Sequence, residues 1–186
     1  MREIEIKATI SSVQSIIDRL TAQGVTVTSA VTQRDRVYGQ IGVDGAAENS
    51  APWLRIRTET KNGTTKHIFT LKRSITNQLD SIEHETVVED AIESENIVTQ
   101  LGFELYSDLT KTRQKAVLGD VEICLDVVEN LGTFIEAERL TADEIEYKVI
   151  VAELWAVLES IGVNRDNEVT DGYDVLMNKK LALTKS

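Results

Sequence analysis

The chain has 186 residues, of which 41% are hydrophobic and 27% are charged, as in an ordinary globular protein with one substantial core. We therefore expect a single domain over residues 1–186. The formal net charge of −11 argues against broad binding to nucleic acid or to an anionic membrane, because both would be repelled. One cysteine, Cys124, cannot form an internal disulfide, and no long apolar span is present, so we expect a reducing cytoplasmic location.

The first elements are an extended segment and a short helix. REIEIKA, residues 2–8, alternates charged and apolar side chains, which is typical of a strand. The following helix is predicted from its apolar spacing, with Ser11 or Ser12 as the N-cap and Gly24 as the stop. Residues 25–43 then favour β-structure, and residues 42–52 form a surface loop.

A run of strands and one helix occupy the middle of the chain. The pair Asn62-Gly63 predicts a hairpin turn between two of these strands. Asp90, with Glu93 three residues later, predicts the start of a helix over residues 91–101. Extended segments are predicted over residues 53–60, 64–74, 81–88, 104–118, 120–129 and 132–140.

The C-terminal part is predicted to be helical. Thr141 and Glu144 form a capping box that predicts a long helix through Leu158. A last helix is predicted over residues 171–183. The resulting class is α+β, with about eight mostly antiparallel strands and helices inserted between groups of strands.

Charged side chains recur with a spacing of two on nearly every predicted strand, and residues two apart in a strand share a face. For any single strand, the simplest interpretation is the solvated face of a one-sided sheet. Taken together, however, the strands carry pairs of like charge, such as E-x-E, R-x-R and K-x-R, rather than the mixture of polar residues typical of a solvent-exposed sheet. Like charges two residues apart repel one another, so a surface under no other constraint would tend to avoid them. The charged positions are Glu3, Glu5, Lys7, Arg55, Arg57, Lys72, Glu83, Glu85, Lys111, Arg113, Lys115, Glu122, Asp126, Glu136 and Glu138.

A barrel with these charges inside would be very costly if it were dry and empty. We therefore expect it to hold water and ions. Arginine and lysine side chains match phosphate oxygens, and clustered carboxylates match a hard cation such as Mg²⁺ or Mn²⁺. A phosphate chain with its metal would satisfy both sets at once.

In chain order, these residues resemble the CYTH superfamily, the triphosphate tunnel metalloenzymes. The pattern between Arg2 and Leu140 is E-x-E-x-K, R-x-R, a lone lysine, E-x-E, K-x-R, a single aspartate and a closing E-x-E. The resemblance implies an eight-stranded antiparallel β-barrel with flanking helices, the triphosphate tunnel. Within the superfamily, LDVVENLGTFIEAE and QRDRVY are similar to class IV adenylyl cyclases, whereas DGYDVLM departs from the Ser-Tyr-containing segment of that branch.

The resemblance also implies roles for individual residues. Catalytic roles are expected for Lys7, Lys111, Arg113 and Asp126. Triphosphate binding is expected for Lys7, Arg55, Arg57, Lys72, Lys111 and Arg113. Metal binding is expected for Glu3, Glu5, Asp126, Glu136 and Glu138. Glu83 and Glu85 would bind a second metal or orient the basic residues, while Lys115 and Glu122 rank lower because only their spacing places them on this face.

The expected function is a Mg²⁺- or Mn²⁺-dependent conversion of ATP to cyclic AMP and pyrophosphate. One alternative is a triphosphatase acting on thiamine triphosphate or inorganic triphosphate, with water instead of the ribose 3′-hydroxyl as the nucleophile. A second alternative is a non-catalytic binder of nucleotides or polyphosphate. The cyclase resemblance also implies a homodimer. We expect Cys124 to be a small buried thiol rather than a nucleophile.

Overall fold

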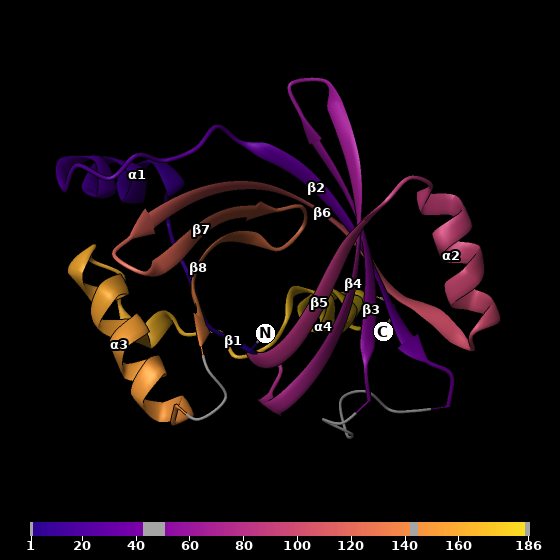
Figure 1. Cartoon of the computed structure of the whole chain (residues 1–186). Helices are drawn as coiled ribbons and strands as arrows, with labels where there is room; N and C mark the ends of the chain where they lie inside the picture. Colours follow the sequence, from indigo (N-terminus) through magenta and orange to yellow (C-terminus); the bar gives the residue numbers. More distant parts are fainter. Residues whose placement is uncertain (1, 43–50, 142–144, 185–186) are drawn as a thin grey trace. The chain divides into compact units, whose positions relative to one another are not determined.

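The computed structural model describes residues 2–42, 51–141 and 145–184 (Figure 1). The strands are β1 (Arg2–Thr9), β2 (Val31–Gln40), β3 (Trp53–Lys61), β4 (Thr64–Asn77), β5 (Asp80–Val88), β6 (Phe103–Leu118), β7 (Val121–Val128) and β8 (Gly132–Thr141). The helices are α1 (Val13–Ala22), α2 (Ala91–Gln100), α3 (Tyr147–Ser160), the 3₁₀ turn η1 (Arg165–Asn167) and α4 (Tyr173–Thr184).

The strands form one sheet in the order β1-β5-β4-β3-β2-β6-β7-β8, which closes on itself as a barrel. Pairing is antiparallel in β1–β8, β2–β3, β3–β4, β4–β5, β6–β7 and β7–β8. The predicted fold class, an eight-stranded antiparallel barrel with flanking helices, is confirmed.

Local sequence signals account for most of the element boundaries. The hairpin between β3 and β4 turns at Asn62 and Gly63, whose φ angles of 50° and 78° suit a two-residue hairpin turn. The Ser12 hydroxyl caps α1 by accepting from the backbone N–H of Ser15. The Asp90 carboxylate caps α2 by accepting from two backbone N–H groups, as predicted.

The start of α3 differs from the prediction. Thr141 is the last residue of β8 rather than a helix cap, and Glu144, its predicted partner, lies outside the described residues. The helix begins at Tyr147, and its N-cap Glu146 makes no side-chain capping bond. The sheet pairing of β8 with β1 extends to Arg2 and Thr141, so hydrogen bonding in the sheet overrides the local capping signal. The predicted loop over residues 42–52 also falls largely outside the described residues.

The chain groups into two compact units. The first comprises Met1–Val31 and Lys111–Thr170, and the second comprises Thr32–Thr110 and Asp171–Ser186. Among the described helices, none combines the length and the apolar character that a bilayer-spanning segment needs.

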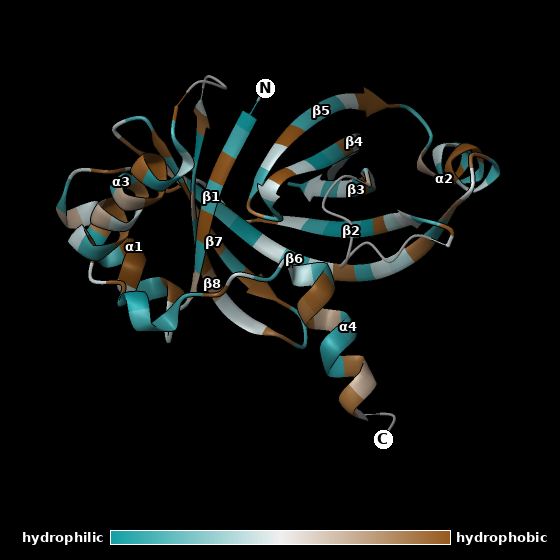
Figure 2. Ribbon diagram, turned by 90° about the horizontal axis from the view of Figure 1, so that it is seen from below, coloured by the Kyte–Doolittle hydropathy of each residue, from teal (hydrophilic) through white to brown (hydrophobic). Residues whose placement is uncertain are grey.

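The core of the first unit lies between its strands and the helices α1 and α3. Apolar side chains such as Ile4 and Ile6 of β1 pack with Leu154 and Trp155 of α3, and all four are almost completely buried. Figure 2 shows hydrophilic and hydrophobic bands along β1, the strand with this alternating pattern. The charged residues at odd positions of β1 therefore lie on the strand face opposite this core, which we call the inner face.

The second unit has a smaller core under α2. Tyr38, Leu54 and Ile56 of β2 and β3 pack with Ala91 and Val98 of α2. Arg55 and Arg57 alternate with Leu54 and Ile56 along β3, so they lie on the inner face of this unit. The core of each unit thus leaves its charged positions on the opposite strand face.

Candidate active site

Strand register brings the charged positions of the first unit opposite one another. On β1 and β8, Lys7 pairs with Glu136 and Glu5 pairs with Glu138. On β6 and β7, Arg113 pairs with Asp126. Directly opposed residues of antiparallel strands point to the same face at close range, so the register itself assembles a charged network.

Arg113 stands at the centre of this network. It donates from Nε to Asp126 Oδ1 over 2.7 Å, and its Nη2 also reaches Glu136. The Lys7 ammonium lies 3.2 Å from Glu136 Oε1 and 3.4 Å from Glu5 Oε1. Lys111 Nζ lies 3.4 Å from Asp126 Oδ2. We call Lys7, Lys111, Arg113, Asp126 and Glu136 the Arg113 network; all five are buried.

The charges of the Arg113 network support one another electrostatically. Burial by itself would raise the pKa of Asp126 and of Glu136, but the neighbouring cations lower both values. Burial likewise opposes the charge of Arg113, yet the two carboxylates hold the pKa of Arg113 well above its usual value. The network is therefore a fixed set of ion pairs at neutral pH rather than a group of neutral side chains.

A second group in the same unit consists mainly of carboxylates. One oxygen each from Glu3, Glu5 and Glu138 lies within 4.8 Å of the others. Burial, a hydrogen bond that Glu138 donates to Glu122 and the charge of Glu3 raise the pKa of Glu138 well above its usual value. Carboxylates that repel one another in this way form a donor set suited to a hard divalent cation. We call Glu3, Glu5 and Glu138 the carboxylate group.

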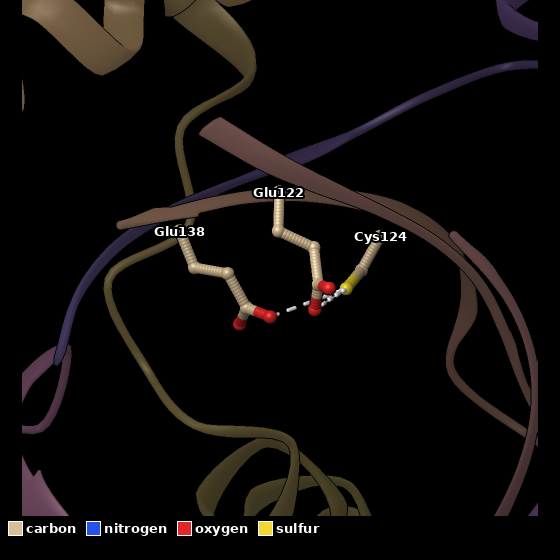
Figure 3. Close-up of side chains that lie close together, drawn as sticks. All are labelled: Glu122, Cys124 and Glu138. Carbon is tan, nitrogen blue, oxygen red and sulfur yellow. Dashed lines mark hydrogen bonds between the residues drawn. The ribbon is translucent and has the colours of Figure 1, made fainter. Parts of the chain in front are cut away.

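Cys124 lies beside the carboxylate group. Figure 3 shows the side chains of Glu122, Cys124 and Glu138 pointing toward one another, with the thiol donating to Glu138 over 3.5 Å. Lys115 contacts Glu122 and lies 4.0 Å from Glu138, so these positions share a face, as their spacing predicts. Burial raises the pKa of the Cys124 thiol, which makes it a poor nucleophile. The interpretation of Cys124 as an unreactive buried thiol agrees with this environment.

The basic residues of the second unit lie among carboxylates of β5. Lys72 Nζ lies 2.8 Å from Glu83 Oε1, and Arg55 Nη2 lies 2.9 Å from Glu85 Oε1. The hydroxyl of Thr70 donates to the same oxygen of Glu85 over 2.8 Å. Burial would raise the pKa of Glu83, but the charges of Lys72 and Arg55 lower it.

Two roles are expected for the β5 carboxylates, namely binding of a second metal and orientation of the basic residues. Within the described ranges, Glu83 and Glu85 belong to neither group of side chains close enough to share an ion. Each accepts from or pairs with a cation of the same face. The ion pairs hold the Arg55 and Lys72 side chains in place, and binding of a second metal by Glu83 and Glu85 stays a prediction.

Asp35 belongs to the segment QRDRVY that resembles class IV adenylyl cyclases, but it was not among the residues given a role in the site. Arg57 donates from Nε and Nη2 to the two oxygens of Asp35 over 2.6 and 2.8 Å. Asp35 stands between Arg34 and Arg36, so β2 lacks the sorted like-charge pair found on the other strands. The sequence signal was the QRDRVY resemblance together with the two-residue spacing of Gln33 and Asp35, and the structure shows both of these residues buried.

Comparisons with known proteins agree with the fold. A protein of Methanocaldococcus jannaschii named "Putative adenylate cyclase" is 27% identical over 173 residues, covering 93% of this chain and 97% of that protein. The structure of the PH1819 protein of Pyrococcus horikoshii OT3 superposes with a TM-score of 0.81 at 27% identity, covering 95% of this chain and 99% of that one.

A more distant structural relative comes from Hippeastrum. It has a TM-score of 0.59 at 18% identity, covers 92% of this chain and 91% of its own, and is described as a "Putative adenylyl cyclase" with a dominant triphosphatase activity. The family model named CYTH domain matches residues 1–173. Since this match spans most of the 186 residues and accompanies the barrel topology, the chain belongs to the CYTH family.

Proposed function

We propose that this protein is a metal-dependent enzyme acting on a triphosphate, with conversion of ATP to cyclic AMP and pyrophosphate as the first candidate reaction. One observation carries the proposal. Lys7 Nζ lies 3.4 Å from Glu5 and 3.2 Å from Glu136, so Lys7 joins the carboxylate group to the Arg113 network. The carboxylates suited to a metal ion and the basic side chains suited to phosphate thus meet at one buried ammonium group, that of Lys7.

The carboxylate group fits a divalent ion. Glu3, Glu5 and Glu138 would hold Mg²⁺ or Mn²⁺, because hard cations prefer carboxylate oxygens. When bound, such an ion neutralises phosphate charge and acts as a Lewis acid. Asp126 and Glu136 complete the proposed metal set, although both accept hydrogen bonds from Arg113, so their first role is to keep Arg113 charged and oriented.

The basic residues would bind the phosphate oxygens. Guanidinium and ammonium groups held by fixed carboxylates need little reorganisation when charge develops on a leaving group. In cyclisation, the ribose 3′-hydroxyl releases its proton to solvent and its oxygen bonds to the α-phosphorus, while the bond from the α-phosphorus to the bridging oxygen breaks. Negative charge therefore accumulates on the leaving pyrophosphate. The proposed ligands for that charge are Lys7, Arg55, Arg57, Lys72, Lys111 and Arg113.

Triphosphatase activity is the second candidate. Attack of water on the γ-phosphorus would use the same cations, and the activity described for the Hippeastrum relative favours this alternative. A binder without turnover would need the cations but not Glu3, Glu5 and Glu138. The close approach of these three carboxylates therefore favours an enzyme.

The test is product analysis. Purified protein is incubated with Mg²⁺ or Mn²⁺ and, separately, with ATP, thiamine triphosphate and tripolyphosphate, and the products are separated and identified by mass. Cyclic AMP with pyrophosphate supports the cyclase, and orthophosphate supports the triphosphatase. Glu138→Gln should abolish turnover, while Glu104→Gln on the exposed part of β6 should not. Binding without turnover in the wild-type protein would reject both enzymes in favour of a binder.

A further inference from the structure

The buried Asp35–Arg57 pair has a specific two-point geometry. Arg57 Nε donates to Oδ1 and Nη2 donates to Oδ2, over 2.6 and 2.8 Å, from directly opposed positions on β3 and β2. We propose that Asp35 is a positioning residue of the triphosphate site, which fixes the plane of the Arg57 guanidinium for phosphate binding. This inference rests on the proposed function, since it concerns the same ligand.

Arg57 needs such a constraint because other anions lie near it. Burial would raise the pKa of Glu59 and of Glu83, and the charge of Arg57 is among those that lower both values. A long side chain without a two-point contact could turn toward either carboxylate. A bidentate aspartate selects one orientation, because the planar guanidinium fork matches the two oxygens of a carboxylate.

Stability alone gives little reason to keep this pair. The Arg57 and Asp35 side chains are only 10% and 7% exposed. Replacing a buried ion pair by well-packed apolar residues is often neutral or stabilising, because both charges lose their hydration. A buried ion pair in this position therefore points to a role for the charged group itself.

The same clamp recurs at a second arginine of the proposed site. Arg113 donates from Nε to Asp126 Oδ1 over 2.7 Å and from Nη2 to Oδ2 over 2.5 Å, again from directly opposed strand positions. In β2 and β3 the aspartate precedes the arginine, whereas in β6 and β7 the order is reversed. The two units thus hold a proposed phosphate-binding arginine in the same way by independent residues, which supports a positioning role.

The test is a double-mutant cycle with Asp35→Asn and Arg57→Met. The dissociation constant for tripolyphosphate is measured by calorimetry, and kcat and KM are measured for the triphosphate that the wild-type protein turns over. Asp35→Asn should weaken tripolyphosphate binding and raise KM by about 10-fold or more, since small misplacements of a binding group have large effects. It should have no further effect in the Arg57→Met background, because Asp35 acts through Arg57.

A matched control is available on the other face of β2. Arg34 donates to Asp108 in the same two-point geometry, over 2.9 and 2.6 Å, but this pair is exposed. Asp108→Asn should leave binding and rates unchanged. Asp35→Glu, which retains a carboxylate, should recover part of the lost affinity. Urea denaturation monitors folding, and Arg57→Lys replaces Arg57→Met if the latter does not fold, because it keeps a positive charge beside Asp35.

The outcomes separate this inference from the proposed function. Unchanged affinity in Asp35→Asn, or an equal loss with and without Arg57, would overturn the positioning role while wild-type turnover of a triphosphate still supported the enzyme. If the wild-type protein binds tripolyphosphate without turnover, the double-mutant cycle still decides the role of Asp35, because it can be measured with the dissociation constant for tripolyphosphate alone. A wild-type protein that binds no triphosphate overturns both.

Discussion

Arg113→Met should strongly destabilise the protein. The substitution removes the cation that contacts Asp126 and Glu136, whose side chains are 0% and 5% exposed. Breaking a buried ion pair by removing one partner costs about 3–5 kcal/mol, because the remaining charge is buried without compensation. The free energy of unfolding of a typical domain is only about 5–15 kcal/mol, so the loss should be large relative to the total.

The destabilisation should depend on pH. In the wild-type protein the neighbouring cations lower the pKa of Asp126 and Glu136 against the effect of burial, so their stabilising contribution is present at neutral pH and lost as pH falls. In Arg113→Met, Asp126 and Glu136 would keep only the neighbouring Lys111 and Lys7, so these carboxylates would take up protons more readily. The difference in unfolding free energy between the two proteins should therefore narrow as pH falls from neutral to about 5.

Urea denaturation in the presence of EDTA measures this difference, with circular dichroism and the fluorescence of the buried Trp155 as probes. Arg34→Met provides the control, because its pair with Asp108 is exposed, at 57% and 34%, and should contribute less than about 1 kcal/mol. Two results would refute the description of this network as buried, mutually supporting charges. One is a loss of unfolding free energy below about 1 kcal/mol in Arg113→Met, and the other is a difference between the two proteins that widens toward acid pH.

Three further predictions concern single groups. Glu138→Gln should weaken Mn²⁺ binding, measured by electron paramagnetic resonance without substrate, because it removes a carboxylate of the three-residue group; unchanged binding would place the ion elsewhere. Burial raises the pKa of Tyr38 to about 12, so the folded state favours the neutral phenol and loses stability as pH rises from about 10 to 12. Tyr38→Phe should lose less unfolding free energy than the wild-type protein over that range, as measured by denaturant titration at each pH. Parallel plots of unfolding free energy against pH for the two proteins would contradict this. Asp90→Ala should cost about 1 kcal/mol in urea denaturation, because two backbone N–H groups at the start of α2 lose their acceptor, whereas Asp90→Asn, which keeps an acceptor, should cost less.

Local signals in the sequence were sufficient for most elements and for the face on which each charge lies. The Asn62-Gly63 turn and the Asp90 cap depend on the conformational preferences of a few adjacent residues, and both occur in the structure as predicted. Alternation along a strand is equally local, so the inner-face positions followed from spacing alone. The start of α3 did not follow, because pairing of β8 with β1 extends the strand to Thr141.

The sequence by itself determined the strand pattern, the inner-face charges and the family resemblance. Only the tertiary structure decided which charges meet: Asp35 with Arg57, Glu83 with Lys72, and Arg113 with both Asp126 and Glu136. It also brought Glu3 and Glu5 of β1 next to Glu138 of β8. The physical reason is that the face of a side chain depends on the backbone of its own strand, whereas ion pairing, burial and pKa depend on distances set by the register between strands.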